Sequence, residues 1–183
     1  MRKHTILGEP KIVFKGLWHK ITQVPATLPN GEKKIFEFVY RVPTVVILAF
    51  DNKKRLLLTK EYKELGKKYI WHLPCGRADK PVSIKANAQA ELREETGFRA
   101  KKIKLVYATP KHFTYPLYGF LASGLISDPL PGDPGEDIQV IPTDLNKAKN
   151  LALSGKIEDP FVAYLIACAW YLIKTKGWKA VYK

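Results

Sequence analysis

Three glutamates, Glu91, Glu94 and Glu95, lie within five residues of one another. In a helix, residues three or four positions apart share a face, so these carboxylates would project side by side. Like charges at this spacing repel one another and weaken the helix. A hard divalent cation removes the repulsion, because Mg²⁺ is typically held by carboxylates, waters and substrate phosphates. Acidic helix faces are common, so the cluster alone favours a solvated helix face, and the residues around it change this interpretation.

Those surrounding residues follow a motif of fixed length. The motif is G-x5-E-x7-R-E-U-x-E-E-x-G-U, where U is an apolar residue, and it is matched here by Gly76, Glu91, Leu92, Glu94, Glu95, Gly97 and Phe98. With this match the chain resembles the Nudix hydrolases. The resemblance implies an α+β fold, the Nudix-type α/β/α sandwich with a mixed sheet and an N-terminal β-hairpin. Capping preferences of Ser83 and Gly97 predict that the glutamates lie on a helix over Ile84–Thr96.

Two motif positions differ from the family pattern. Val82 stands where the family has a glutamate, and Ala90 stands where it has an arginine. An arginine and a glutamate at these places could bridge each other, and losing both leaves no unpaired buried charge. We therefore interpret the replacement of both charged residues by apolar ones as a change that the structure tolerates. It also leaves a second function open, that of a nucleotide-binding protein with impaired catalysis.

The resemblance implies a metal site as well. The cofactor would be Mg²⁺ or Mn²⁺, bound by Glu91, Glu94, Glu95 and the backbone carbonyl of Cys75. A metal ion there would neutralise a diphosphate and lower the pKa of a bound water. Glu94 and Glu95 are therefore expected to be catalytic. The Cys75 thiol itself is expected to be buried and inert.

Similarity to the ADP-ribose pyrophosphatase-like branch extends over most of the chain, from Lys11 to Trp170. Residues 41–43, 60–63 and 72–76 resemble strings that are typical of this branch. The implied reaction is hydrolysis of a diphosphate bond in a nucleoside diphosphate linked to another moiety, most simply a nucleotide sugar such as ADP-ribose. Members of the branch are commonly homodimers with the N-terminal hairpin at the interface, so we expect a homodimer.

Further site residues follow from the same resemblance. In that branch a glutamate on a late loop acts as a base or orients the water, and Glu136 in a Pro/Gly-rich loop is our candidate, with Asp137 second. Arg41, Lys63 and Arg77 are the candidate phosphate neighbours. Lys63 stands where an arginine is usual, which keeps the positive charge but loses the bidentate geometry.

The hydropathy pattern predicts the elements that position these residues. The run from Thr44 to Phe50 is nearly all apolar, which is typical of a strand buried on both faces. Lys11–Gln23 is predicted to be one strand. Strands flank a few helices without strict alternation, which favours a mixed α+β sandwich. We expect one domain with an N-terminal hairpin region over 1–42, the hydrolase domain over 43–176 and a tail over 177–183.

Composition and charge limit the remaining possibilities. The chain has 183 residues, of which 46% are apolar, as in ordinary globular proteins. Its start lacks an apolar signal segment, and its longest apolar run is too short to span a membrane, so we expect the cytoplasm and no membrane partner. The net charge of +14 favours anionic partners such as nucleotides. It also leaves hydrolysis at RNA 5′ ends open as a third function, although nucleic acid is not favoured because no RNA-binding signature is visible.

Overall fold

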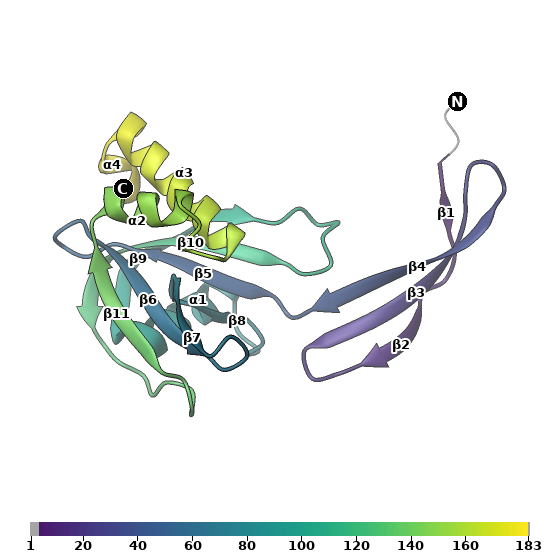
Figure 1. The fold of residues 1–183 in the computed structure, drawn as a ribbon, viewed down its shortest axis with the longest axis horizontal. Helices are drawn as coiled ribbons and strands as arrows, with labels where there is room; N and C mark the ends of the chain where they lie inside the picture. Colours follow the sequence, from purple (N-terminus) through teal and green to yellow (C-terminus); the bar gives the residue numbers. More distant parts are fainter. Residues whose placement is uncertain (1–3, 183) are drawn as a thin grey trace. The chain divides into compact units, whose positions relative to one another are not determined.

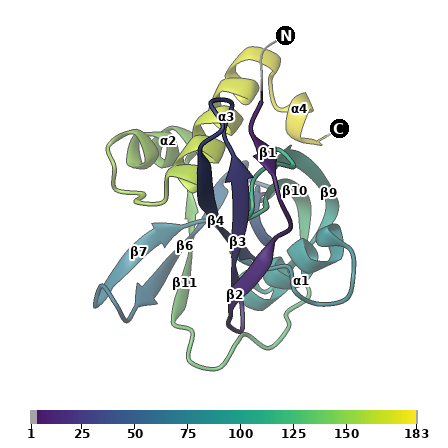
Figure 2. The same ribbon diagram turned by 90° about the vertical axis from the view of Figure 1, so that its right-hand side faces the viewer.

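The computed structural model describes residues 4–182, which form two compact units. One unit comprises the chain up to Pro43 together with Thr109–Pro116. The other comprises Thr44–Ala108 together with the chain from Leu117 onward. Figures 1 and 2 show the ribbon in two views. The sequence-based domain boundaries stay a proposal, and the structure differs from them in grouping Thr109–Pro116 with the N-terminal residues.

A mixed four-stranded sheet forms the centre of the second unit. Its strand order is β8 (Cys75–Arg77), β5 (Thr44–Ala49), β10 (Leu117–Ser127) and β9 (Phe98–Ala108). β5 and β10 run parallel, whereas β8 and β9 are antiparallel to their neighbours. The predicted mixed sheet is therefore confirmed.

A smaller antiparallel sheet completes the β structure of this unit. Its order is β11 (Ile138–Thr143), β6 (Leu56–Lys63) and β7 (Lys68–His72). The first half of β6 is buried, whereas its last four residues are only half-buried. The end of β6 can therefore present polar side chains to a site.

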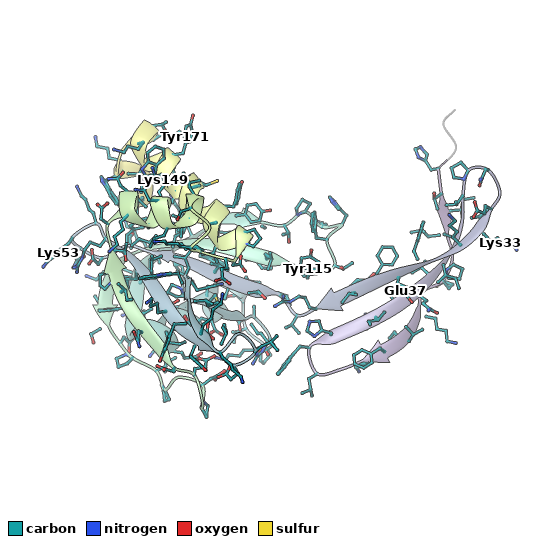
Figure 3. All side chains as sticks on the ribbon, viewed as in Figure 1. Lys33, Glu37, Lys53, Tyr115, Lys149 and Tyr171 are labelled. Atoms are coloured by element: carbon teal, nitrogen blue, oxygen red, sulfur yellow. The ribbon has the colours of Figure 1, made fainter. Side chains whose placement is uncertain are left out.

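Helices flank β5 on both sides. They are α1 (Ile84–Thr96), α2 (Leu145–Leu153), α3 (Pro160–Lys176) and α4 (Lys179–Tyr182). The outer face of the α2 and α3 layer carries Lys149 and Tyr171 (Figure 3). The segment treated as a tail forms α4, and Val181 in it is buried. Among helices of residues 4–182, none is long and apolar enough to cross a membrane.

Strand β5 contributes to two hydrophobic cores. Val45 and Ile47 belong to the core that includes Leu92 of α1. Val46 and Leu48 belong to the core that includes α2 and α3. Alternate side chains of a strand point to opposite faces, so both faces of β5 are buried, as its apolar sequence predicted. Together with the mixed sheet, this arrangement confirms the α/β/α sandwich.

Helix α1 begins and ends at the predicted residues. The Ser83 hydroxyl accepts a hydrogen bond from the Ala86 N–H at 3.1 Å, which caps the first turn. Gly97 has φ of 75° and donates its N–H to the Arg93 carbonyl at 3.0 Å. A side chain at such a positive φ would be strained, so glycine is the natural stop.

The described residues of the first unit, 4–43 and 109–116, form an antiparallel sheet and no helix. Its strands are β1 (Ile6–Leu7), β2 (Lys11–Lys15), β3 (His19–Thr27) and β4 (Lys33–Arg41). β3 is the central strand, since it pairs with the other three. The predicted N-terminal hairpin is confirmed as β3 and β4.

One strand prediction is wrong. The segment Lys11–Gln23 forms two strands, separated by a reversal at residues 16–18. The Gly16 N–H closes this reversal by donating to the His19 carbonyl at 2.8 Å. Apolar alternation continues through the reversal, and this concealed the turn.

Candidate active site

Strand β8 and helix α1 bring the first glycine and the first glutamate of the motif into contact. β8 pairs with β5, and residues 78–83 connect it to α1. A Cβ atom built on Gly76 would lie 2.0 Å from Oε2 of Glu91. The Glu91 carboxylate therefore lies directly against the backbone of β8. Any side chain at position 76 would displace this carboxylate, so the motif needs glycine there.

Glu95 is attached to the same strand. Its Oε2 accepts a hydrogen bond from the Cys75 N–H at 3.2 Å. Burial raises the pKa of Glu95 well above its ordinary value, the Cys75 N–H opposes this shift, and Glu91 adds to it. The carboxylate is thus held beside other negative charges in a place where its charge is poorly solvated.

The surroundings of Glu91 also disfavour its charged form. Burial, followed by the charge of Glu94, raises the pKa of Glu91 to about 7. Lys80 opposes the shift. Glu91 and Glu95 are therefore both carboxylates whose charged form is disfavoured by burial and by neighbouring negative charges.

Glu94 has a cationic partner from the chain itself. Nζ of Lys80 donates to Oε1 of Glu94 at 2.7 Å. The Glu94 side chain is 15% exposed and that of Lys80 is 46% exposed. The ammonium group therefore binds the acidic face from its solvent side.

This donor set fits a hard divalent cation. Three carboxylates leave α1 on one face, and two of them have raised pKa values that a nearby positive charge would lower. Within residues 4–182, no three acidic, imidazole or thiol side chains converge as ready-made metal ligands. The contacts explain this, since Glu94 is turned to Lys80 and Glu95 to the Cys75 N–H.

Glu136, the predicted base, lies within electrostatic reach of this face. Its charge contributes to the raised pKa values of both Glu91 and Glu95. Burial and then the charge of Asp133 raise the pKa of Glu136 itself. The late loop therefore contributes a poorly stabilised carboxylate to the same region as α1.

Comparison with protein families decides the assignment. The NUDIX domain family matches residues 40–164 of this chain. The chain belongs to the Nudix family. It is accordingly a pyrophosphohydrolase, and the departures at Val82 and Ala90 do not remove it from the family.

Individual relatives agree with this assignment. The chain is 28% identical to an ADP-ribose pyrophosphatase of Bacillus subtilis (strain 168) over 159 residues, which make up 84% of this chain and 86% of the relative. It is 27% identical over 116 residues to a methanol dehydrogenase activator of Bacillus methanolicus, with 62% and 63% of the two chains covered. The crystal structure of an ADP compounds hydrolase superposes with a TM-score of 0.82 at 19% identity, covering 96% of this chain and 97% of that one, and confirms the fold.

The Nudix site contains a further carboxylate that the sequence analysis missed. Glu61 on β6 forms an ion pair with Lys63, and its charge raises the pKa values of Glu95 and Glu136. Lys63 and Arg77 act on Glu136 in the opposite direction. The strand alternation of 56–63 already places residues 61 and 63 on one face, and this signal could have identified Glu61.

Asp137, the second candidate base, has a structural contact. Its carboxylate accepts a hydrogen bond from the Tyr69 hydroxyl, and its carbonyl accepts one from the Tyr62 N–H at 3.1 Å. These bonds connect the loop to the β6–β7 hairpin. Glu136 is therefore the better candidate of the two.

The predicted phosphate neighbours occupy different settings. Arg77 lies on β8 directly after the first glycine of the Nudix motif, and its Nε donates to Asp79 at 3.3 Å. Arg41 ends β4 in the first unit, where its backbone N–H donates to the Thr114 carbonyl at 3.2 Å. Substrate binding by either residue stays a prediction.

The Cys75 thiol is unreactive. Burial raises the pKa of its thiol, so the thiol stays protonated at neutral pH. Beside it, Nδ1 of His72 contacts the Leu73 carbonyl at 2.8 Å, and Nε2 lies 3.8 Å from Asp159. Asp159 in turn caps α3, with its carboxylate accepting from the Phe161 N–H at 2.8 Å. This polar cluster joins β7 to α3.

Proposed function

We propose that the enzyme hydrolyses a diphosphate bond in a nucleoside diphosphate linked to another moiety, and that the reaction depends on a divalent metal ion. The observation that carries the proposal is the set of three carboxylates on one face of α1, two of which have pKa values raised by burial and by neighbouring negative charges. Glu91, Glu94, Glu95 and the Cys75 carbonyl are the proposed ligands of Mg²⁺ or Mn²⁺. When bound, the metal supplies charge neutralisation for the diphosphate and a more acidic water.

The other residues of the site have their own roles in this proposal. Glu136 takes a proton from the attacking water or orients it, and its raised pKa makes it a better base near neutral pH than an ordinary glutamate. Lys63 and Arg77 supply positive charge to the phosphate groups, as does Arg41. No covalent intermediate is required, because water attacks the phosphorus directly.

A nucleotide sugar such as ADP-ribose is the proposed substrate. The support is similarity over most of the chain to the ADP-ribose pyrophosphatase of Bacillus subtilis. The net charge of +14 agrees with an anionic substrate. We retain the cytoplasm as the predicted location.

We also propose a homodimer in which the first unit is covered by the second copy. Within residues 4–43, a sheet without helices exposes many apolar side chains, among them Ile12, Phe14, Leu17, Ile35 and Val39. Leu17 is 87% exposed. Polar residues such as Lys33 and Glu37 on β4 accompany them (Figure 3). So many exposed apolar side chains in one small unit favour a protein–protein interface.

The test is hydrolysis by the purified protein with Mg²⁺ or Mn²⁺ of ADP-ribose, other nucleotide sugars, dinucleoside polyphosphates, nucleoside triphosphates and 5′-triphosphorylated RNA. The proposal expects metal-dependent release of AMP and ribose phosphate from ADP-ribose, and loss of this product in Glu94→Gln. Tight nucleotide binding without product would support the impaired-catalysis alternative. Preferential hydrolysis of RNA 5′ ends, with steep salt dependence, would support the RNA alternative.

A further inference from the structure

The loop between β8 and α1 holds its backbone in a fixed place. Nδ2 of the buried Asn87 donates to the carbonyls of Ser83 at 3.1 Å, Val82 at 3.3 Å and Lys80 at 3.4 Å. These contacts attach the loop to the second turn of α1. Lys80 therefore extends its side chain from a braced backbone rather than from a free loop.

The Lys80 ammonium group faces several carboxylates at once. It donates to Glu94, and its pKa is raised by this hydrogen bond and by the charges of Glu94, Glu91 and Asp133. The effect is mutual, because Lys80 lowers the pKa of Glu91. The ammonium group thus supplies positive charge where the motif concentrates negative charge.

The arginine of α1 that adjoins Glu94 does not fill this role. Arg93, the direct neighbour of Glu94, donates to the Asp128 carbonyl at 2.9 Å and to its carboxylate at 3.0 Å. Ala90 stands where the Nudix pattern has an arginine, and Val82, its partner position, is 55% exposed. Neither of the motif's usual bracing charges is present in this chain.

We infer that Lys80 is a positioning residue of the acidic helix: it holds Glu94 at the site in the metal-free enzyme, in place of the missing arginine–glutamate pair, and a divalent cation displaces it. This inference rests on the proposed metal dependence. The Glu94 carboxylate that accepts from Lys80 is also one of the proposed metal ligands. Ammonium and metal repel each other, so they compete for Glu94. A side chain 46% exposed can turn to solvent when the metal arrives.

The experiment compares Mn²⁺ binding to wild type, Lys80→Met, Lys80→Arg and Lys85→Met by electron paramagnetic resonance titration of the full-length protein. Lys85 is an exposed lysine at the start of α1 and serves as the charge-matched control. Removing a competing cation at contact distance should tighten Mn²⁺ binding about tenfold in Lys80→Met. Lys85→Met should change it less than about twofold, because an exposed charge without an ion pair to the glutamates is screened. Lys80→Arg should restore wild-type affinity.

The outcomes separate this inference from the function on which it rests. If wild type and variants all fail to bind Mn²⁺, the metal dependence is wrong and the inference is overturned with it. If wild type binds but Lys80→Met is unchanged, or matches Lys85→Met, only the competition is wrong. Weaker binding in Lys80→Met would likewise overturn the displacement, since the lysine would then be a permanent brace.

A second readout keeps the test independent of Mn²⁺ affinity. The gain in unfolding temperature on adding saturating Mg²⁺ should be larger in Lys80→Met than in wild type, because the metal-free variant loses its internal counter-charge. An equal gain in both proteins would contradict the inference.

Discussion

Helices α1 and α3 cover opposite sides of β5 but contribute differently. α3 buries five side chains, all of them apolar, in the larger core. α1 buries only three, one of which is the polar Asn87, and it carries three half-buried glutamates. Hydrophobic burial makes α3 a stabilising element, whereas the carboxylates of α1 are the proposed metal ligands, and their mutual repulsion weakens the helix. Substitutions in the two helices should therefore separate activity from stability.

The largest expected effect is loss of activity in Glu95→Gln. Neutralising a proposed metal ligand should lower kcat on the order of 10³-fold or more, since charge stabilisation by the metal is lost. The unfolding temperature of the metal-free protein should stay the same or rise, because a buried negative charge is removed. Turnover assays and thermal unfolding provide the two measurements. Unchanged turnover would refute the role of Glu95.

Gly76→Ala should act on the same site through geometry. The new methyl group would displace the Glu91 carboxylate, which lies 2.0 Å from the Cβ position. Moving a proposed ligand by about an ångström can reduce the rate on the order of 10²-fold. The flexible glutamate can yield, so the fold should survive, and circular dichroism checks this. A rate equal to that of wild type would show that the close contact has no functional importance.

Ile166→Ala in α3 should show the opposite pattern. Ile166 is fully buried, and truncating such a side chain costs roughly 2–5 kcal/mol of unfolding free energy. Activity per folded molecule should change little, because Ile166 lies in the core away from α1. Urea unfolding measures the loss. A large fall in kcat with unchanged stability would contradict the division between the two helices.

The smallest effect is a pH dependence of stability. The pKa of Glu91 is raised from 4.5 to about 7, so between these values the folded protein holds a proton that the unfolded chain has released. Stability contributed by this group therefore falls as pH rises from 4.5 to about 7. Glu91→Gln should reduce the fall, as measured by urea unfolding of metal-free protein across this range. Identical pH profiles for wild type and variant would contradict the shifted pKa.

The ends of α1 could be predicted from the local sequence, whereas contacts between distant segments could not. Ser83 and Gly97 fixed both ends of the helix because their capping preferences depend only on neighbouring residues. The apolar run of β5 predicted burial on both faces for the same reason. The turn at Gly16 was missed, because the apolar pattern of β2 resumes in β3 without a break.

The carboxylate at Glu61 and the cation at Lys80 show why the site was incompletely predicted. Glu61 reaches the acidic helix from β6, about thirty positions earlier in the chain, so only the sheet brings the two together. Lys80 interacts with Glu94 across fourteen positions through a loop braced by Asn87. The spacing of the sequence predicted the three glutamates of the helix. The position of the Lys80 ammonium group depends on the loop conformation, which no sequence periodicity reveals.

The central claim is that the α1 carboxylates bind a divalent cation. Its most direct test is the anomalous scattering of Mn²⁺ in crystals of the protein soaked with manganese. We expect a peak bounded by Glu91, Glu94 and Glu95, with the Lys80 ammonium group withdrawn from Glu94. Crystals saturated with Mn²⁺ that show no peak there, with Lys80 still bound to Glu94, would contradict the account.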